Sequence, residues 1–586
     1  MKTTVVTRSL QLLVIIFLIN ACKKSPARND VGNGNGNGNG NGGNNVPPVD
    51  PPIANTIGFF LDDWSSKTFT VPAYVDTTIP AVSPTTTVSI DASTILTKIP
   101  RTVFGQNANS WMTQIVTQSS LMNYLTDLHP GTIRFPGGSI SDTYFWNADP
   151  GSFPVDAPDS LLDANGNKIA GGYWSGKNTE SWTISLDSYY QLLQQSGSTG
   201  IITVNYGYAR YGTNADPVAA AAHLAADWVR YDNGRTKYWE VGNECNGVWE
   251  AGYRINTSAN HDGQPQIVTG NLYGQHFKVF TDSMKKAAQE IGKTIYIGAY
   301  ILEAQPQSWQ TPTDQSWNTG VLGAVNSSAD FYIIHSYYTP YQENSTADVI
   351  LNSATDNTFA MMNYVRSGIT NAGGAVKPIA LTEWNITSQG SMQQVSFVNG
   401  MHAAILFGEA LKNNYGQTSR WDLANGWANG NDHGLFNIGD EPGVALWNPR
   451  PAFYYMYYFE RMIGDRLLNT AVSGAGAVNV LAYASSFTSG EKGVILVNKA
   501  NAQQTVNVTL KNATAGARYY FYTLTGGTDN GEFSRKVFVN GAGPTQVSGG
   551  PSTNYALIKP YSATTQNGIK LTLPARSVVY LVIDKN

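Results

Sequence analysis

The amino-acid sequence predicts an α/β fold, a (β/α)₈ barrel followed by an antiparallel β-sandwich. Over residues 101–465, eight short apolar segments rich in β-branched and aromatic residues alternate with helical patterns. After residue 466 the strand-like segments continue between turn-rich spacers, while the helical patterns stop. Strands that are apolar on both faces suit a parallel barrel. An open doubly wound sheet is the alternative, but it does not account for polar and aromatic residues at nearly every strand end.

The first 22 residues are expected to be a lipoprotein signal peptide. Lys2 and Arg8 give a positive start, and the apolar run at residues 10–19 is too short to span a bilayer comfortably. The run leads into Asn20-Ala21-Cys22, which with Ile19 resembles a bacterial lipoprotein box. We therefore expect Cys22 to carry lipid and to anchor the protein to the cell envelope, at the outer membrane, on its periplasmic or cell-surface face. An ordinary signal peptide that contains a cysteine is the alternative.

Two further segments precede the barrel. Residues 23–53 contain a glycine–asparagine repeat and proline pairs, which bury too little apolar surface to become ordered, so we expect a flexible tether. Residues 54–100 are expected to be an N-terminal arm that contributes strands to the sandwich, because residues 86–90 alternate like a strand. If Cys22 is lipidated, Cys245 is the remaining thiol and no internal disulfide can form.

Each element of the barrel has a local signal. The expected strands are residues 102–107, 132–135, 201–205, 237–241, 294–298, 330–335, 378–382 and 419–423. The expected helices are residues 119–128, 186–195, 217–231, 272–291, 359–369, 398–412 and 451–463. Asp216 as N-cap and Pro217 as first helical residue predict one of these helix starts. In the sandwich, residues 466–586, strands are expected at 478–483, 493–497, 505–510, 519–524 and 577–583.

Composition narrows the class of partner. The chain has 13% charged residues and a formal net charge of -4, which argues against nucleic acid because such a partner requires a basic patch. Its 14 tryptophans and 32 tyrosines suit a secreted protein that handles neutral polymers. The sequence has no His-x-x-x-His pair and no cysteine cluster, so it predicts neither a metal site nor a cofactor.

Two glutamates follow predicted strands in matching surroundings. The strand at residues 237–241 runs into Gly242, Asn243 and Glu244, and the strand at 378–382 runs into Glu383 and Trp384. For either glutamate alone, capping a turn is the ordinary alternative. Because the carboxyl ends of barrel strands meet at one face, the two carboxylates are expected to lie together. Such a pair is what glycoside hydrolysis requires.

These residues resemble those of a known group of enzymes. Asn243-Glu244, Glu383 and the trailing sandwich look like the large clan of retaining (β/α)₈ glycoside hydrolases. The segments Arg134-Phe-Pro-Gly-Gly138 and Thr382-Glu-Trp-Asn385 are similar to the α-L-arabinofuranosidases of glycoside hydrolase family 51, and more loosely to families 39, 79 and 30. The resemblance covers residues 87–586. Residues 139–146 and 246–253 depart from the arabinofuranosidase pattern, which leaves the sugar open.

The resemblance implies a role for each candidate residue. Glu383 is expected to be the nucleophile and Glu244 the acid/base of a double displacement. Arg134 is expected to point inward and keep Glu383 ionised, with an exterior salt bridge as the alternative. Asn243 is expected to hydrogen-bond the sugar hydroxyl next to the anomeric carbon. Further expected substrate-site residues, each with ordinary packing as its alternative, are His335 and Tyr337 near the nucleophile and Trp146 and Trp427 as sugar platforms.

Three functions are compatible with these residues. The first is a retaining glycoside hydrolase acting on plant or algal polysaccharide, with α-L-arabinofuranosidase as the preferred activity. The second is an endo-acting glycanase of the same clan, acting on xylan, glucan or galactan. The third, from a different class, is a catalytically inactive glycan-binding surface lipoprotein. A transglycosylase would use the same residues as a hydrolase.

Overall fold

The computed structural model of the chain describes residues 47–78, 83–325 and 327–586. The expected signal peptide, the lipidation site Cys22 and most of the expected tether lie outside the described residues. All described residues belong to one compact unit, Asn45–Asn586. Within the described part of the chain, no helix has both the length and the apolar character needed to cross a membrane.

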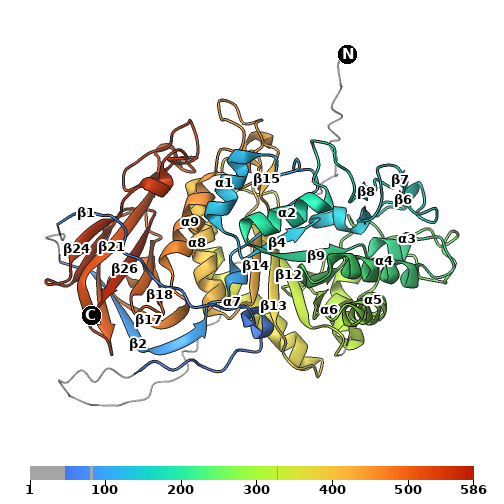
Figure 1. Cartoon of the computed structure of the whole chain (residues 1–586), viewed down its shortest axis with the longest axis horizontal. Coiled ribbons are helices and arrows are strands. Elements are labelled where there is room, and N and C mark those ends of the chain that lie inside the picture. Colours follow the sequence, from blue (N-terminus) through green and yellow to red (C-terminus); the bar gives the residue numbers. More distant parts are fainter. Residues whose placement is uncertain (1–46, 79–82, 326) are drawn as a thin grey trace. The chain divides into compact units, whose positions relative to one another are not determined.

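Eight parallel strands close into a barrel in which each strand pairs with the next one along the chain (Figure 1). They are β3 (Gly105–Asn107), β4 (Thr132–Phe135), β9 (Thr199–Val204), β10 (Thr236–Val241), β11 (Tyr296–Tyr300), β12 (Phe331–Tyr337), β13 (Ile379–Asn385) and β14 (Gln417–Arg420). The last strand, β14, pairs with β3 and closes the ring. The predicted (β/α)₈ barrel is confirmed. The first strand is shorter than predicted because Arg101–Val103 forms a 3₁₀ turn.

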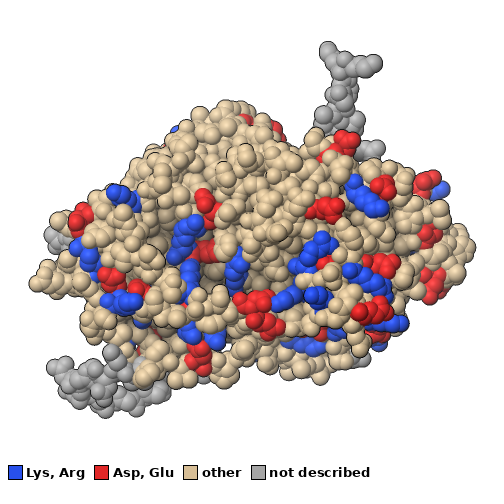
Figure 2. Space-filling view, viewed as in Figure 1, with Lys and Arg blue, Asp and Glu red and all other residues tan. Residues whose placement is uncertain are grey.

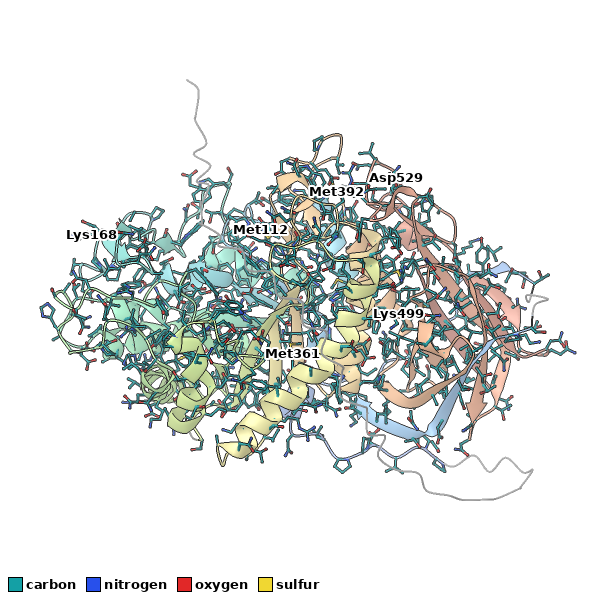
Figure 3. The ribbon with its side chains drawn as sticks, turned by 180° about the vertical axis from the view of Figure 1, so that it is seen from behind. Met112, Lys168, Met361, Met392, Lys499 and Asp529 are labelled. Carbon is teal, nitrogen blue, oxygen red and sulfur yellow. The ribbon has the colours of Figure 1, made fainter. Side chains whose placement is uncertain are left out.

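Helices follow the barrel strands. They are α1 (Ser119–Leu128), α2 (Leu186–Ser196), α3 (Gly207–Tyr211), α4 (Pro217–Asp232), α5 (Gly270–Glu290), α6 (Pro312–Val325), α7 (Ala347–Asn371), α8 (Phe397–Lys412) and α9 (Pro451–Met462). The predicted start of α4 is confirmed, because Asp216 Oδ1 accepts the backbone N–H of Ala219 at 3.0 Å. Figure 3 labels Met361 on α7, which begins earlier than the predicted 359–369.

The sequence prediction missed helix α6. Its buried Trp317, Val321 and Val325 lie four residues apart on one face, but Gly320 and Gly323 between them lower helix propensity. One of these glycines has a packing role, since a Cβ on Gly320 would lie 2.5 Å from the backbone nitrogen of Asn271 in α5. Close contact with α5 therefore favours a residue that weakens the local helix signal.

Short elements fill the loops. The insertion between β4 and α2 contains β5 (Tyr144–Phe145), β6 (Ser160–Leu162), β7 (Lys168–Ala170) and β8 (Trp174–Ser175), and Lys168 marks it in Figure 3. After β14 come β15 (Ala424–Asn425) and β16 (Phe436–Asn437). The 3₁₀ turns are η1 (Gly58–Leu61), η2 (Arg101–Val103), η3 (Gly138–Thr143), η4 (Ala428–Gly430), η5 (Ala477–Asn479) and η6 (Tyr555–Leu557).

Eleven of the remaining strands form one sheet, which has a hydrophobic core of its own. In the order of pairing they are β1 (Val75–Asp76), β24 (Tyr561–Thr564), β21 (Ala515–Gly526), β26 (Ser577–Lys585), β19 (Lys492–Asn498), β18 (Val480–Ser486), β17 (Arg466–Gly474), β2 (Thr86–Lys98), β20 (Gln504–Lys511) and β25 (Ile569–Leu573), with β23 (Val537–Val539) on β21. The strand β22 (Asp529–Glu532) lies outside this sheet. Four strands of the 11-stranded sheet contribute to one buried hydrophobic cluster, through Val88, Val494, Leu571 and Val579.

The predicted C-terminal β-domain is confirmed, with a sheet that is mixed and not antiparallel throughout. Strand β2 runs parallel to β20, and β1 runs parallel to β24. Both parallel strands come from residues that precede the barrel, so no hairpin forces them to run against their neighbours. The segment before the barrel thus supplies β2, which lies between β17 and β20.

Helices α8 and α9 pack against this sheet. The hydroxyl of Tyr483 in β18 donates to Glu409 in α8 at 3.0 Å, and that of Tyr580 in β26 donates to the backbone oxygen of Tyr455 in α9 at 2.7 Å. On the face seen in Figure 2, lysines and arginines are interspersed with acidic residues, and neutral residues cover most of the surface.

Candidate active site

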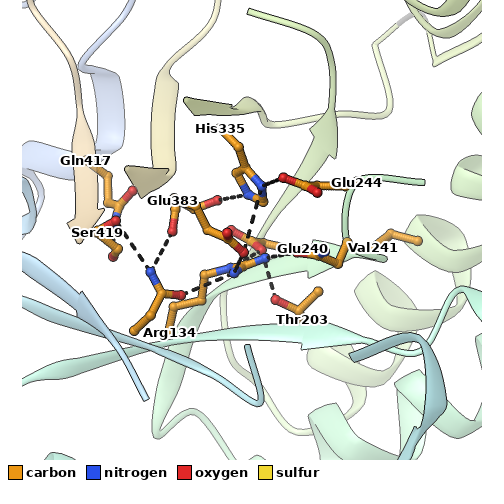
Figure 4. A network of polar contacts seen from close by, with 12 residues as sticks. Arg134, Thr203, Glu240, Val241, Glu244, His335, Glu383, Gln417 and Ser419 are labelled. Carbon is orange, nitrogen blue, oxygen red and sulfur yellow. Dashed lines mark hydrogen bonds and ion pairs between the residues drawn. The ribbon is translucent and has the colours of Figure 1, made fainter. Parts of the chain in front are cut away.

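The site lies at the carboxyl ends of four barrel strands (Figure 4). Arg134 comes from β4, Glu244 from the turn after β10, His335 from β12 and Glu383 from β13. Strand β13 continues through Asn385, three residues beyond its predicted end, so Glu383 is itself a strand residue. His335 and Glu383 are register partners in the pairing of β12 with β13, which places their side chains together.

Arg134 is the centre of the network. Its side chain is completely buried, and its Nε donates to Glu240 Oε2 at 2.6 Å. One terminal nitrogen donates to Glu383 Oε1 at 2.8 Å and to Asn107 Oδ1 at 3.2 Å, and the other donates to Asn243 Oδ1 at 2.8 Å. The expected inward orientation is therefore present, and Arg134 does not form an exterior salt bridge. Burial acts to lower the pKa of Arg134, but the charges of Glu240 and Glu383 outweigh it and raise this pKa.

Glu240, which the sequence analysis did not select, is the second partner of this arginine. Its Oε2 accepts from Arg134 and from the hydroxyl of Thr203 at 2.8 Å, inside the barrel. A charged residue within an otherwise apolar strand, Tyr238-Trp239-Glu240-Val241, is the signal that could have identified it. We interpret Glu240 as the counter-charge that holds the guanidinium in place.

The two predicted carboxylates are close to one another. One oxygen of Glu244, one oxygen of Glu383 and one ring nitrogen of His335 all lie within 4.8 Å of each other. Retaining glycosidases have carboxyl groups about 5–5.5 Å apart, whereas inverting enzymes need about 6.5–9.5 Å. The geometry is therefore that of a retaining pair.

His335 and Tyr337 both contact this pair, as the resemblance implied. His335 Nδ1 lies 2.9 Å from Glu244 Oε1 and 3.8 Å from Glu383 Oε1, and its Nε2 lies 3.0 Å from the hydroxyl of Thr382. The hydroxyl of Tyr337 donates to Glu383 Oε2 at 3.0 Å. Both oxygens of Glu383 are thus oriented, one by Arg134 and one by Tyr337.

The electrostatic surroundings of the three titratable groups differ. Burial raises the pKa of Glu383, although the charges of His335 and Arg134 oppose this shift. Burial also acts to raise the pKa of Glu244, but the hydrogen bond and charge of His335, together with the N–H of Trp249, outweigh it and lower this pKa. Burial acts to lower the pKa of His335, but Glu383 and Glu244 outweigh it and raise this pKa. Glu383 and Glu244 therefore both favour the protonated form of His335.

The same three side chains are chemically able to ligate a cation, since two carboxylates and an imidazole are common metal ligands. The guanidinium of Arg134, 2.8 Å from Glu383, already supplies a positive charge to that carboxylate. A divalent cation in this position would be repelled by it. The donor set therefore suits proton transfer better than metal binding.

Asn243 is held by a further set of buried acids. Its side-chain N–H donates to Glu250 Oε1 at 2.8 Å, and the same oxygen accepts from the hydroxyl of Ser139 at 2.8 Å. Its backbone N–H donates to Asp142, whose pKa burial raises to about 7. One amide hydrogen of Asn243 remains for a sugar hydroxyl, the role that the resemblance implied. Ser139 and Glu250 come from the two segments that depart from the family pattern.

The two predicted tryptophan platforms both make packing contacts. The ring of Trp146 packs on Trp228, at 6.0 Å between centroids, and its N–H donates to the backbone oxygen of Leu224 at 3.0 Å, so it supports α4. Trp427 is nearly buried, and the guanidinium groups of Arg450 and Arg535 each lie 5.2 Å from its ring centroid. We correct both assignments to packing roles, because these contacts already occupy the two rings.

Replacing Arg134 with methionine would leave Glu240 buried without a counter-charge and would remove the guanidinium partner of Glu383. We expect the free energy of unfolding to fall by about 3–5 kcal/mol, measured by denaturant titration. Arg230→Met is the matched control, because Arg230 pairs with Glu290 at the surface and should contribute less than about 1 kcal/mol. Equal losses in the two variants would contradict the central role of Arg134.

Comparison with known proteins is consistent with this geometry. Residues 124–349 match the family model described as alpha-L-arabinofuranosidase 1 domain. An intracellular exo-alpha-(1->5)-L-arabinofuranosidase of Acetivibrio thermocellus is 21% identical over 296 residues, which cover 48% of this chain and 51% of that protein. The protein of the same name from Streptomyces lividans is 22% identical over 288 residues, covering 46% and 37%. The chain thus spans about half, or less, of the length of these curated relatives.

Solved structures extend the likeness to most of the chain. The α-L-arabinofuranosidase of Thermotoga maritima has a TM-score of 0.57 at 16% identity, covering 85% of this chain and 99% of that one. The GH51 arabinofuranosidase of Xanthomonas axonopodis pv. citri has a TM-score of 0.58 at 14% identity, covering 86% and 100%. These solved structures share the fold of this chain, and the matched family model lies within its barrel region, at residues 124–349.

Proposed function

We propose that this chain is a retaining glycoside hydrolase that releases α-L-arabinofuranosyl residues from plant or algal polysaccharide. The observation that carries the proposal is the pair formed by Glu244 and Glu383, which approach within 4.8 Å at the carboxyl ends of the barrel strands. Unpaired carboxylates would suit a glycan-binding protein equally well. Here each carboxylate has its own hydrogen-bond partners, which gives the two groups the different surroundings that a nucleophile and an acid/base need.

In the first step, Glu383 attacks the anomeric carbon and displaces the glycosidic oxygen, forming a glycosyl ester. Arg134 and Tyr337 hold its two oxygens and direct its free lone pairs at the sugar. Glu244 gives a proton to the departing oxygen as the bond breaks, so the leaving sugar departs as a neutral alcohol. In the second step, Glu244 removes a proton from water, which attacks the ester and restores Glu383.

The source of the first proton follows from the network. His335 Nδ1 lies 2.9 Å from Glu244 Oε1, and the charges of Glu383 and Glu244 raise the pKa of the histidine, which favours its protonated form as the donor to Glu244. As the glycosidic oxygen gains negative charge, that proton passes to Glu244 and on to the oxygen. The second step returns a proton to Glu244 and thence to His335. We therefore assign His335 as the proton store of the acid/base.

The sugar is the more specific part of the proposal. Support comes from the arabinofuranosidase family model and from the relatives whose names specify exo-α-(1→5)-L-arabinofuranosidase activity. The endo-acting alternative has its own support, because a bifunctional glucanase-xylanase from a metagenome library has a TM-score of 0.55 over 86% of this chain. A substrate panel separates the two.

Glu383→Gln should reduce turnover of an aryl α-L-arabinofuranoside by at least about 10³-fold, since the amide cannot act as nucleophile.

Glu244→Ala should slow the hydrolysis of substrates with poor leaving groups most. Added azide should restore activity by attacking the glycosyl ester, giving an azide product of retained configuration. For the wild type and both variants, the rate of product release is measured on the aryl glycoside and also on arabinan, xylan and glucan. Activity only on an internal xylan or glucan linkage would favour the endo-glycanase. A wild-type protein that binds glycans but equals Glu383→Gln in rate would refute catalysis.

The pH dependence of kcat/KM should have two limbs. Activity requires ionised Glu383, whose pKa is raised above its usual 4.5, so the rate falls as the pH drops through a value above 4.5. It also requires the stored proton, so the rate falls as the pH rises through the raised pKa of His335, above 6.5. Burial also raises the pKa of Glu303 to about 7, and this carboxyl group interacts electrostatically with Glu244 and His335.

His335→Asn keeps an N–H donor but removes the titration, and we expect its alkaline limb to move to lower pH. His276→Asn is the control, because burial lowers the pKa of His276 to about 4 and the residue lies on α5. An alkaline limb that stays in place in His335→Asn would show that another group stores the proton.

We further propose that Cys22 is lipidated and anchors the protein to the outer membrane. The proposal is supported by the lipoprotein-like box that ends at Cys22. Cells expressing the full chain and fed a palmitate analogue should label the wild type and the Cys245→Ser control, in which the buried thiol is changed, but not Cys22→Ser. Label in Cys22→Ser, or its absence from all three proteins, would contradict the anchor.

A further inference from the structure

The side-chain amide of Asn243 is held at both of its ends. Its Oδ1 accepts from a terminal nitrogen of Arg134 at 2.8 Å, and its Nδ2 donates to Glu250 Oε1 at 2.8 Å. A guanidinium group can only donate, so its partner must be the amide oxygen. The amide nitrogen then faces Glu250, which accepts from it. The two contacts together specify a single orientation of this buried amide.

Glu250 is buried, and only one of its two oxygens is hydrogen-bonded. Oε1 accepts from Asn243 and from the hydroxyl of Ser139, whereas Oε2 has no hydrogen-bond partner among the described residues. Burial raises the pKa of Glu250 well above its usual range, and the charges of Asp142 and Glu244 raise it further. A neutral carboxylic acid keeps one carbonyl oxygen that accepts. In this form Glu250 presents its carbonyl oxygen to Asn243 and Ser139.

Asp142 holds the backbone at the same position. Its Oδ2 accepts the N–H of Asn243 at 3.3 Å, and its Oδ1 accepts the N–H of Gly207 at 3.1 Å. Burial raises the pKa of Asp142 to about 7, and hydrogen bonds from backbone N–H groups limit this rise. Asp142 therefore loses its proton before Glu250 does, and its charge favours the neutral form of Glu250.

The contact between Ser139 and Glu250 joins the two segments that depart from the arabinofuranosidase pattern, residues 139–146 and 246–253. Next to this contact, the second hydrogen on Nδ2 of Asn243 has no partner among the described residues. A buried N–H without an acceptor is unfavourable, so a ligand that brings an oxygen to this position gains a hydrogen bond. The orientation of the amide decides that this ligand group must be an acceptor.

We propose that Glu250 is a positioning residue for substrate recognition: together with Ser139 it orients the amide of Asn243 so that the free N–H selects sugars with a hydroxyl group next to the anomeric carbon. This inference rests on the proposed glycosidase function and deepens it. Glu250 acts through Asn243 and does not touch the reacting atoms. Without its acceptor, the amide nitrogen can turn about the contact with Arg134, and the hydrogen bond to the sugar hydroxyl is lost.

The test compares the aryl glycoside that the wild type hydrolyses fastest with its 2-deoxy analogue, which lacks this hydroxyl. In Glu250→Leu, kcat/KM for the hydroxylated substrate should fall at least about tenfold, mainly through kcat, since the hydrogen bond to this hydroxyl strengthens in the transition state. The rate on the 2-deoxy analogue should change less than about twofold. In an Asn243→Ala background, adding Glu250→Leu should cause no further loss on either substrate.

Three variants serve as controls. Glu250→Gln keeps a carbonyl acceptor and places an amide nitrogen where the neutral acid has its hydroxyl, so it should retain most of the wild-type rate. Ser139→Ala, a milder change, should give a smaller loss confined to the hydroxylated substrate. Asp232→Asn changes another buried acid, which accepts the backbone N–H of Thr236 at 2.9 Å at the amino end of β10, and should leave the ratio of the two rates unchanged.

Three results would overturn the positioning role. Equal losses of Glu250→Leu on both substrates would show that Glu250 only supports the fold, and unchanged rates on both would show that it has no role. A loss in Glu250→Gln as large as that in Glu250→Leu would show that a charge is required, and not a neutral acceptor.

The glycosidase proposal is tested separately by the wild type. If the wild type hydrolyses no aryl glycoside of arabinose, xylose, glucose or galactose, the proposed function fails. A crystal structure of Glu250→Leu then tests the positioning by itself, and an Asn243 amide that keeps its wild-type orientation would contradict it.

Discussion

A buried positive charge organises the catalytic end of this barrel. Arg134 is completely buried and donates to side chains from β3, β10 and β13 and to Asn243 after β10. Burying a guanidinium is unfavourable unless its donors are paired with acceptors of opposite charge, and Glu240 and Glu383 meet that need. The same contacts that make the arginine tolerable also fix the orientation of the proposed nucleophile. Stability and the proposed catalysis therefore depend on one ion-pair network.

The two carboxylates near this charge have different hydrogen-bond partners. Glu383 receives hydrogen bonds on both oxygens, whereas Glu244 receives one from His335 and one from Trp249. The two carboxylates thereby acquire different environments, which is how a pair of identical side chains divides into nucleophile and acid/base. Trp249 combines its hydrogen bond to Glu244 with an exposed ring.

Much of the barrel could be predicted from local patterns. Strand β4 and helix α1 match the predicted residues 132–135 and 119–128, since short β-rich runs and an amphipathic helix need little tertiary context. Helix α6 was missed because Gly320, which α5 requires for close packing, weakens the local signal. The parallel pairing of β2 with β20 joins residues more than 400 positions apart, and no local pattern records such a pairing.

The sequence by itself determined the barrel and the two glutamates near the carboxyl ends of its fourth and seventh strands, because strand ends and their side chains are local features that parallel topology brings to one face. Only the tertiary structure decided which other residues surround them. It brought Glu240 to Arg134 and His335 to Glu244, and it placed Trp146 and Trp427 in packing contacts. The reason is that the surroundings of a side chain depend on distances across the barrel, which residue types and spacing do not encode.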